Sequence, residues 1–115
     1  MYKVTLCDGK YDGTSIFREA YLKDGQLHID GQDLGASVSE FWGNSEYEYF
    51  YSFSSEMTSC LHDCLKKDSE TADDLLTLIA RYFSGILGDI RLREYCKNKQ
   101  IVYEFHNYYR RLNIR

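Results

Sequence analysis

The feature that most constrains the fold is the Asp24-Gly25 pair, which separates two segments of alternating apolar and polar residues. An Asp-Gly pair supplies the positive φ angles that a two-residue hairpin turn requires. The apolar residues that share one face are Ile16, Ala20 and Leu22 before the turn, and Leu27 and Ile29 after it. Together with residues 2–7, these segments predict a three-stranded antiparallel meander.

Residues 45–53 show the clearest two-residue period in the chain. One face of this predicted strand carries Tyr47, Tyr49, Tyr51 and Phe53, and the other carries Glu46, Glu48, Phe50 and Ser52. We expect the tyrosines to pack under helices with their hydroxyls at the rim, which leaves the two glutamates on the exposed face. The alternative is that the tyrosines form a binding surface, which suits their large contact area and few torsions.

Apolar stripes at helical spacing predict one short helix and three longer ones. The short helix runs from an Asp33 cap through Leu34, Val38, Phe41 and Trp42 to Gly43. The longer helices cover about residues 55–67, 71–84 and 86–98, and a closing strand follows at 101–106. The predicted fold class is therefore α+β, an antiparallel sheet of about five strands with helices packed on one face.

Length and composition are typical of one globular domain, residues 1–115, with 43% hydrophobic and 28% charged residues. The N-terminal apolar run is too short for a signal peptide, and no stretch approaches the roughly 18–20 apolar residues of a membrane span. We therefore expect no membrane association and a cytoplasmic location, where the four cysteines stay free thiols.

Charge is segregated along the chain. Between Asp24 and Leu65 there are eight acidic residues and no Lys or Arg, so this segment carries −8 while the remainder carries +4. If the segment stays together in space, its negative face raises the association rate of a basic partner by ~10–10³-fold. The alternative is a solvated surface that keeps the protein in solution.

The predicted partner-binding residues lie in this acidic segment. The charge is expected from Asp30, Asp33, Glu40, Glu46 and Glu48, and the anchoring from Trp42 and Tyr49. Aromatic anchors carry much of the binding energy in protein interfaces, whereas charges at the rim mainly change the association rate and its salt dependence.

Other chemistries find less support in the sequence. Cys60 and Cys64 lie one helical turn apart, but no second ligand pair with zinc-finger spacing exists, so we expect apolar packing and neither a metal nor another cofactor. Nucleic acid is disfavoured because the only basic cluster lies at the C-terminal end. No catalytic residue is assigned, although His28 and His106 could meet in one sheet and, with Glu104, perform acid–base chemistry.

The runs at residues 31–35, 41–43 and 46–49 resemble a small family of bacterial cytosolic proteins. The compactness and acidity of that family are similar to those of immunity proteins that neutralise polymorphic toxins. The shared residues are structural in character, so the resemblance implies a class of partner, a toxin domain, and transfers no site.

The sequence thus favours a non-enzymatic protein-binding module that presents an acidic, aromatic-rich face to a basic protein partner. One alternative is a small-molecule-binding protein or a modest enzyme, with a pocket between helices and sheet that uses His28, Tyr103 or His106. Another is a structural subunit of an obligate oligomer, which requires a large exposed apolar patch.

Overall fold

The computed structural model describes residues 2–35 and 45–111, which form a five-stranded antiparallel sheet and three helices. The strands are β1 (Lys3–Tyr11), β2 (Thr14–Lys23), β3 (Gln26–Gly35), β4 (Ser45–Ser52) and β5 (Glu104–Arg111). They lie in the sheet in chain order, and each pairs with its sequence neighbours. The α+β prediction is confirmed.

Two Asp-Gly pairs form the turns of the first two hairpins. The φ angles are 52° and 80° in the Asp12-Gly13 pair, and 53° and 77° in the Asp24-Gly25 pair. Positive φ at both central residues gives the turn a twist that matches that of its two strands. The Asp8-Gly9 pair lies inside β1, so the first strand is longer than predicted.

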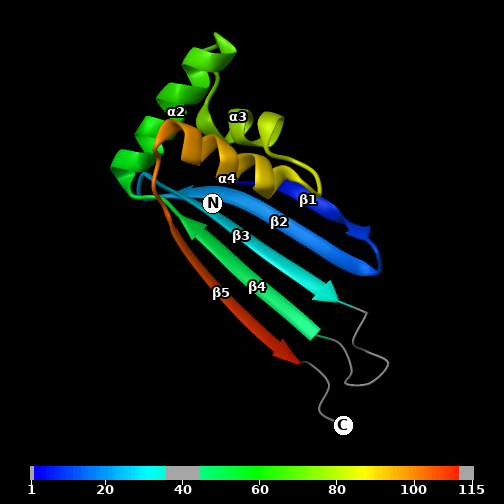
Figure 1. Ribbon diagram of the computed structural model, residues 1–115. Coiled ribbons are helices and arrows are strands. Elements are labelled where there is room, and N and C mark those ends of the chain that lie inside the picture. The colour runs from blue at the N-terminus through cyan, green and yellow to red at the C-terminus, as the bar shows by residue number, and fades with distance from the viewer. Residues whose placement is uncertain (1, 36–44, 112–115) are drawn as a thin grey trace.

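Three helices follow β4: α2 (Ser55–Ser69), α3 (Leu75–Tyr82) and α4 (Gly88–Lys99). Side chains cap the first two, because the Ser54 hydroxyl accepts the backbone N–H of Met57 at 3.1 Å and the Asp74 carboxylate accepts that of Thr77 at 2.8 Å. Figure 1 shows the helices gathered over one end of the sheet. None of the helices in the described part of the chain is long and apolar enough to cross a membrane.

The predicted short helix at residues 33–43 is wrong at its start, because β3 continues through Gly35. Asp33 lies opposite Tyr47, and Leu34 lies opposite Glu46, in the β3–β4 ladder. The sheet therefore satisfies backbone groups that a helix would have to bond internally. The rest of the predicted helix, residues 36–43, lies outside the described residues.

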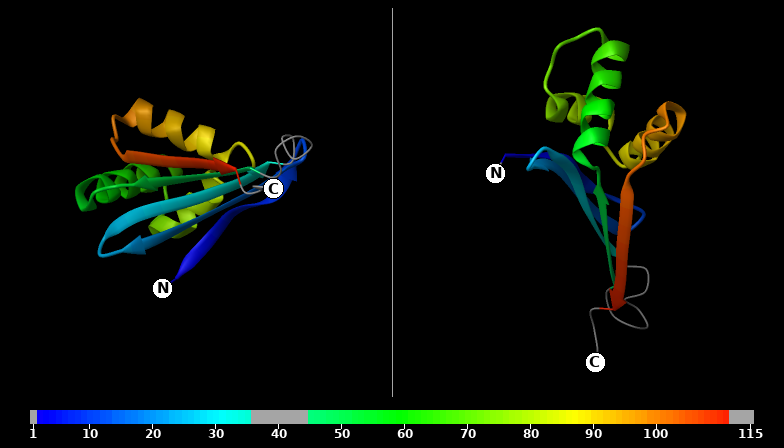
Figure 2. Two further views of the ribbon diagram at one scale, coloured as in Figure 1. Left: turned by 90° about the horizontal axis from the view of Figure 1, so that it is seen from below. Right: turned by 90° about the vertical axis from the view of Figure 1, so that its left-hand side faces the viewer.

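Alternation along the strands gives the sheet two different faces. We call the face under the helices the covered face and the opposite one the open face. The buried covered-face residues Ala20, Leu27, Ile29, Tyr49, Tyr51 and Phe53 share one core with Leu61, Leu78, Ile79 and Leu92 of the helices. The prediction that the tyrosines of β4 pack under helices is therefore confirmed for Tyr49 and Tyr51. The right-hand view of Figure 2 shows β4 and β5 extending well beyond this helical end.

A buried arginine joins the covered face to the segment between α3 and α4. The Arg18 side chain is 3% exposed. Its Nε donates to the Tyr49 hydroxyl at 2.9 Å, and its Nη atoms donate to the backbone carbonyls of Gly85 and Ile86 at 3.1 and 2.7 Å. The Tyr49 hydroxyl in turn donates to Asp33 Oδ1 at 3.1 Å. These partners offset the cost of removing the guanidinium from water.

Candidate functional site

A shallow hollow lies over the three central strands on the open face, and we call it the open-face hollow. Its volume is about 220 Å³. Strands β2, β3 and β4 line it with Phe17, Glu19, Asp30, Gly31, Gln32, Glu48 and Phe50. The hollow therefore combines two aromatic rings with three carboxylates.

Strand register explains why these residues meet. Glu19 lies opposite Asp30 in the β2–β3 ladder, and Asp30 lies opposite Phe50 in the β3–β4 ladder. Gln32 is two residues along β3 from Asp30, and it lies opposite Phe17 of β2 and Glu48 of β4. Since directly opposite side chains begin only about 5 Å apart at Cβ, segments distant in the sequence supply one continuous surface.

The charges of Glu19 and Asp30 are only partly compensated within the protein. Glu19 and Asp30 are like charges in directly opposite positions, which is unfavourable. Lys3 Nζ lies 3.0 Å from Glu19 Oε2, and the Tyr21 hydroxyl donates to Asp30 Oδ2 at 3.2 Å. Partial burial still raises the pKa of Asp30, and the neighbouring Glu19 carboxylate raises it further. A cation placed here would lower the energy of both carboxylates.

Three of the predicted partner-binding residues lie on the open face. Asp30 and Glu48 line the hollow. Glu46 is 6% exposed, accepts a hydrogen bond from the side-chain amide of Gln32, and lies opposite Arg110 in the β4–β5 ladder. Glu46 is therefore largely enclosed, and the accessible charge is that of Asp30, Glu48 and Glu19.

The structure places Asp33 and Tyr49 on the covered face instead. Asp33 is three positions from Asp30, an odd number, so the two side chains project to opposite faces of β3. Tyr49 is 3% exposed and bonded to Arg18 and Asp33, and burial raises the pKa of Asp33. Tyr49 is therefore closed to a partner, and Asp33 is partly buried beside it. Glu40 and Trp42 lie outside the described residues.

The base-free acidic segment does not form one continuous surface in the described part of the chain. Asp24 lies in the β2–β3 turn, and Glu56 and Asp63 lie on α2. The expectation that this segment stays together is corrected accordingly. Of its carboxylates, those of Asp30 and Glu48 line the open-face hollow, where Glu19 from outside the segment joins them.

Sequence reasoning missed Phe17, Glu19 and Phe50. The signal for them is the strand alternation itself, because Phe17 and Glu19 alternate with Ile16 and Arg18 of the covered face. Only the register of the hairpin shows that these side chains reach Asp30 and Glu48.

The two strand histidines do not meet, because β4 lies between β3 and β5. His106 Nε2 lies 3.7 Å from Glu104 Oε1. His28 borders another hollow of about 410 Å³, to which Ser52, Tyr103 and Glu104 also contribute. Within residues 2–35 and 45–111, no cluster of three or more His, Cys, Asp or Glu side chains could hold a metal ion. The four cysteines are free thiols.

Comparison with protein-family models, with curated proteins and with solved structures finds no match for this chain.

Proposed function

We propose that the protein is a non-enzymatic binding module that presents its open face to a basic protein partner. The observation that supports this is the open-face hollow, where Glu19, Asp30 and Glu48 surround the rings of Phe17 and Phe50. Partly compensated carboxylates beside accessible aromatic rings suit a partner that offers positive charge together with flat contact area.

Arginine is the partner side chain that best fits this hollow. Its planar guanidinium pairs with carboxylates through two parallel hydrogen bonds and stacks on aromatic rings. Between Glu19 and Asp30 it would relieve their repulsion, and over Phe50 it would gain a cation–π interaction. The protein already contains such a pair, because the Arg93 guanidinium lies 4.8 Å from the centroid of the Phe105 ring.

We place this encounter in the cytoplasm, where thiols stay reduced. A basic toxin domain, the partner class implied by the resemblance at residues 31–35, 41–43 and 46–49, fits the charge of the open face. Association with such a partner slows as salt rises, because exposed charges act mainly on the association rate and are screened over a Debye length of about 8–10 Å.

Site-specific photo-crosslinking in the host cells tests this proposal. A benzophenone side chain replaces Phe17, which is 37% exposed on the open face, or Ile90, which is 50% exposed on α4. We expect one discrete adduct with a basic protein from position 17 and none from position 90. Equal adducts from both positions, or an acidic protein captured at position 17, would contradict the proposal.

Charge variants then test the mechanism with the purified partner. The double variant Glu19→Gln and Glu48→Gln removes two carboxylates from the hollow. The control, Glu56→Gln and Asp63→Asn, removes two exposed carboxylates from α2 with the same change in net charge. We expect the first pair to slow association about tenfold or more at low salt, and the control to change it less than twofold. Equal effects would mean that only net charge matters.

The hollow beside His28 supports a second candidate function, the binding of a small polar molecule. Its volume of about 410 Å³ suffices for such a ligand, and Ser52, Tyr103 and Glu104 supply polar groups. In a fragment screen by NMR, ligands of this hollow should lose affinity on His28→Ala, while crosslinking from position 17 stays unchanged. Fragments unaffected by His28→Ala would exclude this function.

A further inference from the structure

The two edges of the sheet differ in whether another strand can add to them. At one edge, the β1–β2 register is irregular between Thr5 and Cys7, and the backbone N–H of Gly85 donates to the carbonyl of Leu6 at 2.8 Å. A bulge and a covering loop are two devices by which open sheets keep an edge strand from pairing with other chains. The β1 edge is therefore protected against strand addition.

The β5 edge carries neither device within residues 104–111. β5 pairs with β4 in continuous register over all 8 of its residues, and it contains no Pro, Gly or Lys. Among the described residues, no backbone hydrogen bond joins β5 to any element other than β4. About half of the backbone N–H and C=O groups of β5 therefore point outward, where they can pair with another strand.

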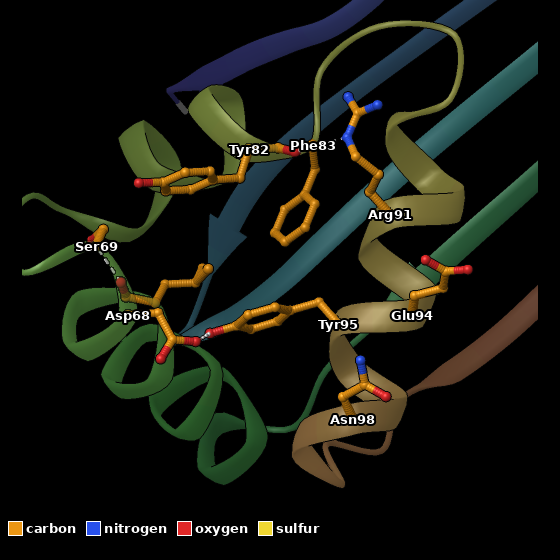
Figure 3. A pocket seen from close by; sticks show the side chains of 9 residues that line it. Asp68, Ser69, Tyr82, Phe83, Arg91, Glu94, Tyr95 and Asn98 are labelled. Carbon is orange, nitrogen blue, oxygen red and sulfur yellow. Dashed lines mark hydrogen bonds between the residues drawn. The ribbon is translucent and has the colours of Figure 1, made fainter.

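The helix that precedes β5, α4, makes its contacts elsewhere. Figure 3 shows the Tyr95 ring directed toward Asp68 of α2, where its hydroxyl donates to Asp68 Oδ2 at 2.7 Å. Arg93 lies over the covered face, because its Nε donates to the Tyr51 hydroxyl at 2.7 Å and its guanidinium lies 4.8 Å from the centroid of the Phe105 ring. Figure 1 shows β5 as the outermost strand, extending beyond the helices. The outer edge of β5 is therefore accessible in the single chain.

The sequence of β5 is complementary to itself when two copies of the strand run antiparallel. A twofold axis perpendicular to the joined sheet keeps the open faces of both copies on one side, so each residue lies opposite one an even number of positions away. An axis centred on Asn107 places Glu104 of each copy opposite Arg110 of the other. Opposite charges in directly opposite positions stabilise antiparallel pairing.

The same register also pairs aromatic residues. It places Phe105 opposite Tyr109 on the covered face, and His106 opposite Tyr108 on the open face. Tyr108 and Tyr109 are 62% and 61% exposed in the single chain, so both gain contacts when a second strand adds. Aromatic pairs across strands stabilise a sheet.

Neighbouring registers lack this complementarity. An axis centred on His106 places Glu104 opposite Tyr108. An axis centred on Tyr108 places His106 opposite Arg110 and moves Glu104 past the end of the facing strand. Neither register brings opposite charges together, so the charges of β5 favour the axis at Asn107.

We propose that β5 pairs with β5 of a second copy of this chain, antiparallel and centred on Asn107, and joins two five-stranded sheets into one of ten strands. A single edge strand buries little area, so the dimer is weak and reversible. Both open faces lie on the same side of the joined sheet, and the two β3 strands are five strand spacings apart, about 24 Å.

Analytical ultracentrifugation of the full chain tests the dimer. Between about 10 µM and about 1 mM protein we expect a shift from monomer to dimer, with a Kd of about 10–100 µM. Glu104→Lys places like charges opposite each other at both pairs and should weaken the dimer at least about tenfold. The control Glu56→Lys makes the same change of net charge in the first turn of α2 and should change the Kd less than about twofold.

Cysteine crosslinking tests the register without changing its charges. Residues directly opposite each other have Cα atoms about 4.5–5.5 Å apart, within the range of about 4.4–6.8 Å that a disulfide spans. Under mild oxidation we therefore expect Asn107→Cys to form a covalent dimer across the axis. His106→Cys should not, because the two positions would lie about 8 Å apart in this register. Thr5→Cys, an exposed position on β1, should crosslink no more than the native thiols do.

Three results would overturn the inference: a monomer at 1 mM, equal effects of Glu104→Lys and Glu56→Lys on the dimer, or crosslinking at His106→Cys or Thr5→Cys as efficient as at Asn107→Cys. None of these measurements involves the basic partner of the open face. Photo-crosslinking to that partner from position 17 should persist in Glu104→Lys, so either proposal can fail while the other stands.

Discussion

The two faces of the sheet differ in how their charged side chains are partnered, although the same strands build both. On the covered face, Arg18 is surrounded by the Tyr49 hydroxyl and two backbone carbonyls. On the open face, the next residue of the same strand, Glu19, lies opposite a second carboxylate, Asp30. The covered face therefore satisfies its buried charge, whereas the open face keeps partly compensated charge, which the proposed function assigns to a partner.

Arg18→Met should have the largest effect on stability. The substitution leaves the Tyr49 hydroxyl, the carbonyls of Gly85 and Ile86, and the Asp89 carboxylate without their buried donor. We expect the free energy of unfolding, measured by urea denaturation, to fall by about 3–5 kcal/mol.

The control for Arg18→Met is Lys3→Ala on the open side, which removes an exposed pair with Glu19 and should cost at most about 1 kcal/mol. Equal losses in the two variants would mean that the Arg18 network is not what joins the α3–α4 segment to the sheet.

Gly31→Ala is expected to have the next largest effect. A Cβ at this position would lie 2.2 Å from Tyr49 Cε2 in the covered face. We expect a loss of about 1–3 kcal/mol from overpacking, measured by thermal and urea unfolding. Gly9→Ala is the matched control, because a Cβ there meets nothing within 4 Å. A harmless Gly31→Ala would show that Tyr49 is free to move.

The pH dependence of stability compares the two faces, because Asp30 lies on the open face and Asp33 on the covered face. Burial raises the pKa of both carboxyls above the ordinary 3.8. The folded state therefore binds a proton at each of these carboxyls more strongly than the unfolded state does. The resulting contribution to the free energy of unfolding is fully present below pH 3.8. It is lost as pH rises through the raised pKa.

We expect Asp30→Asn and Asp33→Asn each to reduce the loss of stability as pH rises through that window, measured by urea denaturation at a series of pH values. Carbon-13 NMR of the carboxyl groups adds the effect of the partner. A bound basic partner should lower the pKa of Asp30 and leave that of Asp33 unchanged. A change confined to Asp33 would contradict the assignment of faces.

Glu19→Gln with Glu48→Gln should have the smallest effect on the isolated protein. Both side chains are partly exposed, and removing Glu19 relieves its repulsion with Asp30. We expect the free energy of unfolding to change by no more than about 0.5 kcal/mol. A loss above about 2 kcal/mol would mean that these carboxylates stabilise the fold.

The strands and their faces can be predicted from the sequence, because alternation and Asp-Gly turns are local signals. Alternation predicts that Tyr51 points into the core, and Tyr51 is fully buried. The helical spacing of apolar residues within 33–43 is also a local signal, but pairing of Asp33 and Leu34 with β4 outweighs it.

The site could be predicted only in part. Asp30 and Glu48 stand out as acids of a base-free segment, whereas their meeting with Glu19 depends on hairpin register. Alternation with Ile16 and Ala20 puts Arg18 on the covered face, but its partners could not be predicted, because backbone carbonyls of a distant loop are among them.

Carboxyl footprinting with a carbodiimide, read by mass spectrometry on the partner complex and on the protein alone, tests the central claim most directly. We predict that the partner protects Glu19, Asp30 and Glu48 and leaves the exposed Glu56 and Asp63 of α2 labelled as before. Protection of the two α2 residues, with the open-face carboxylates unchanged, would contradict it.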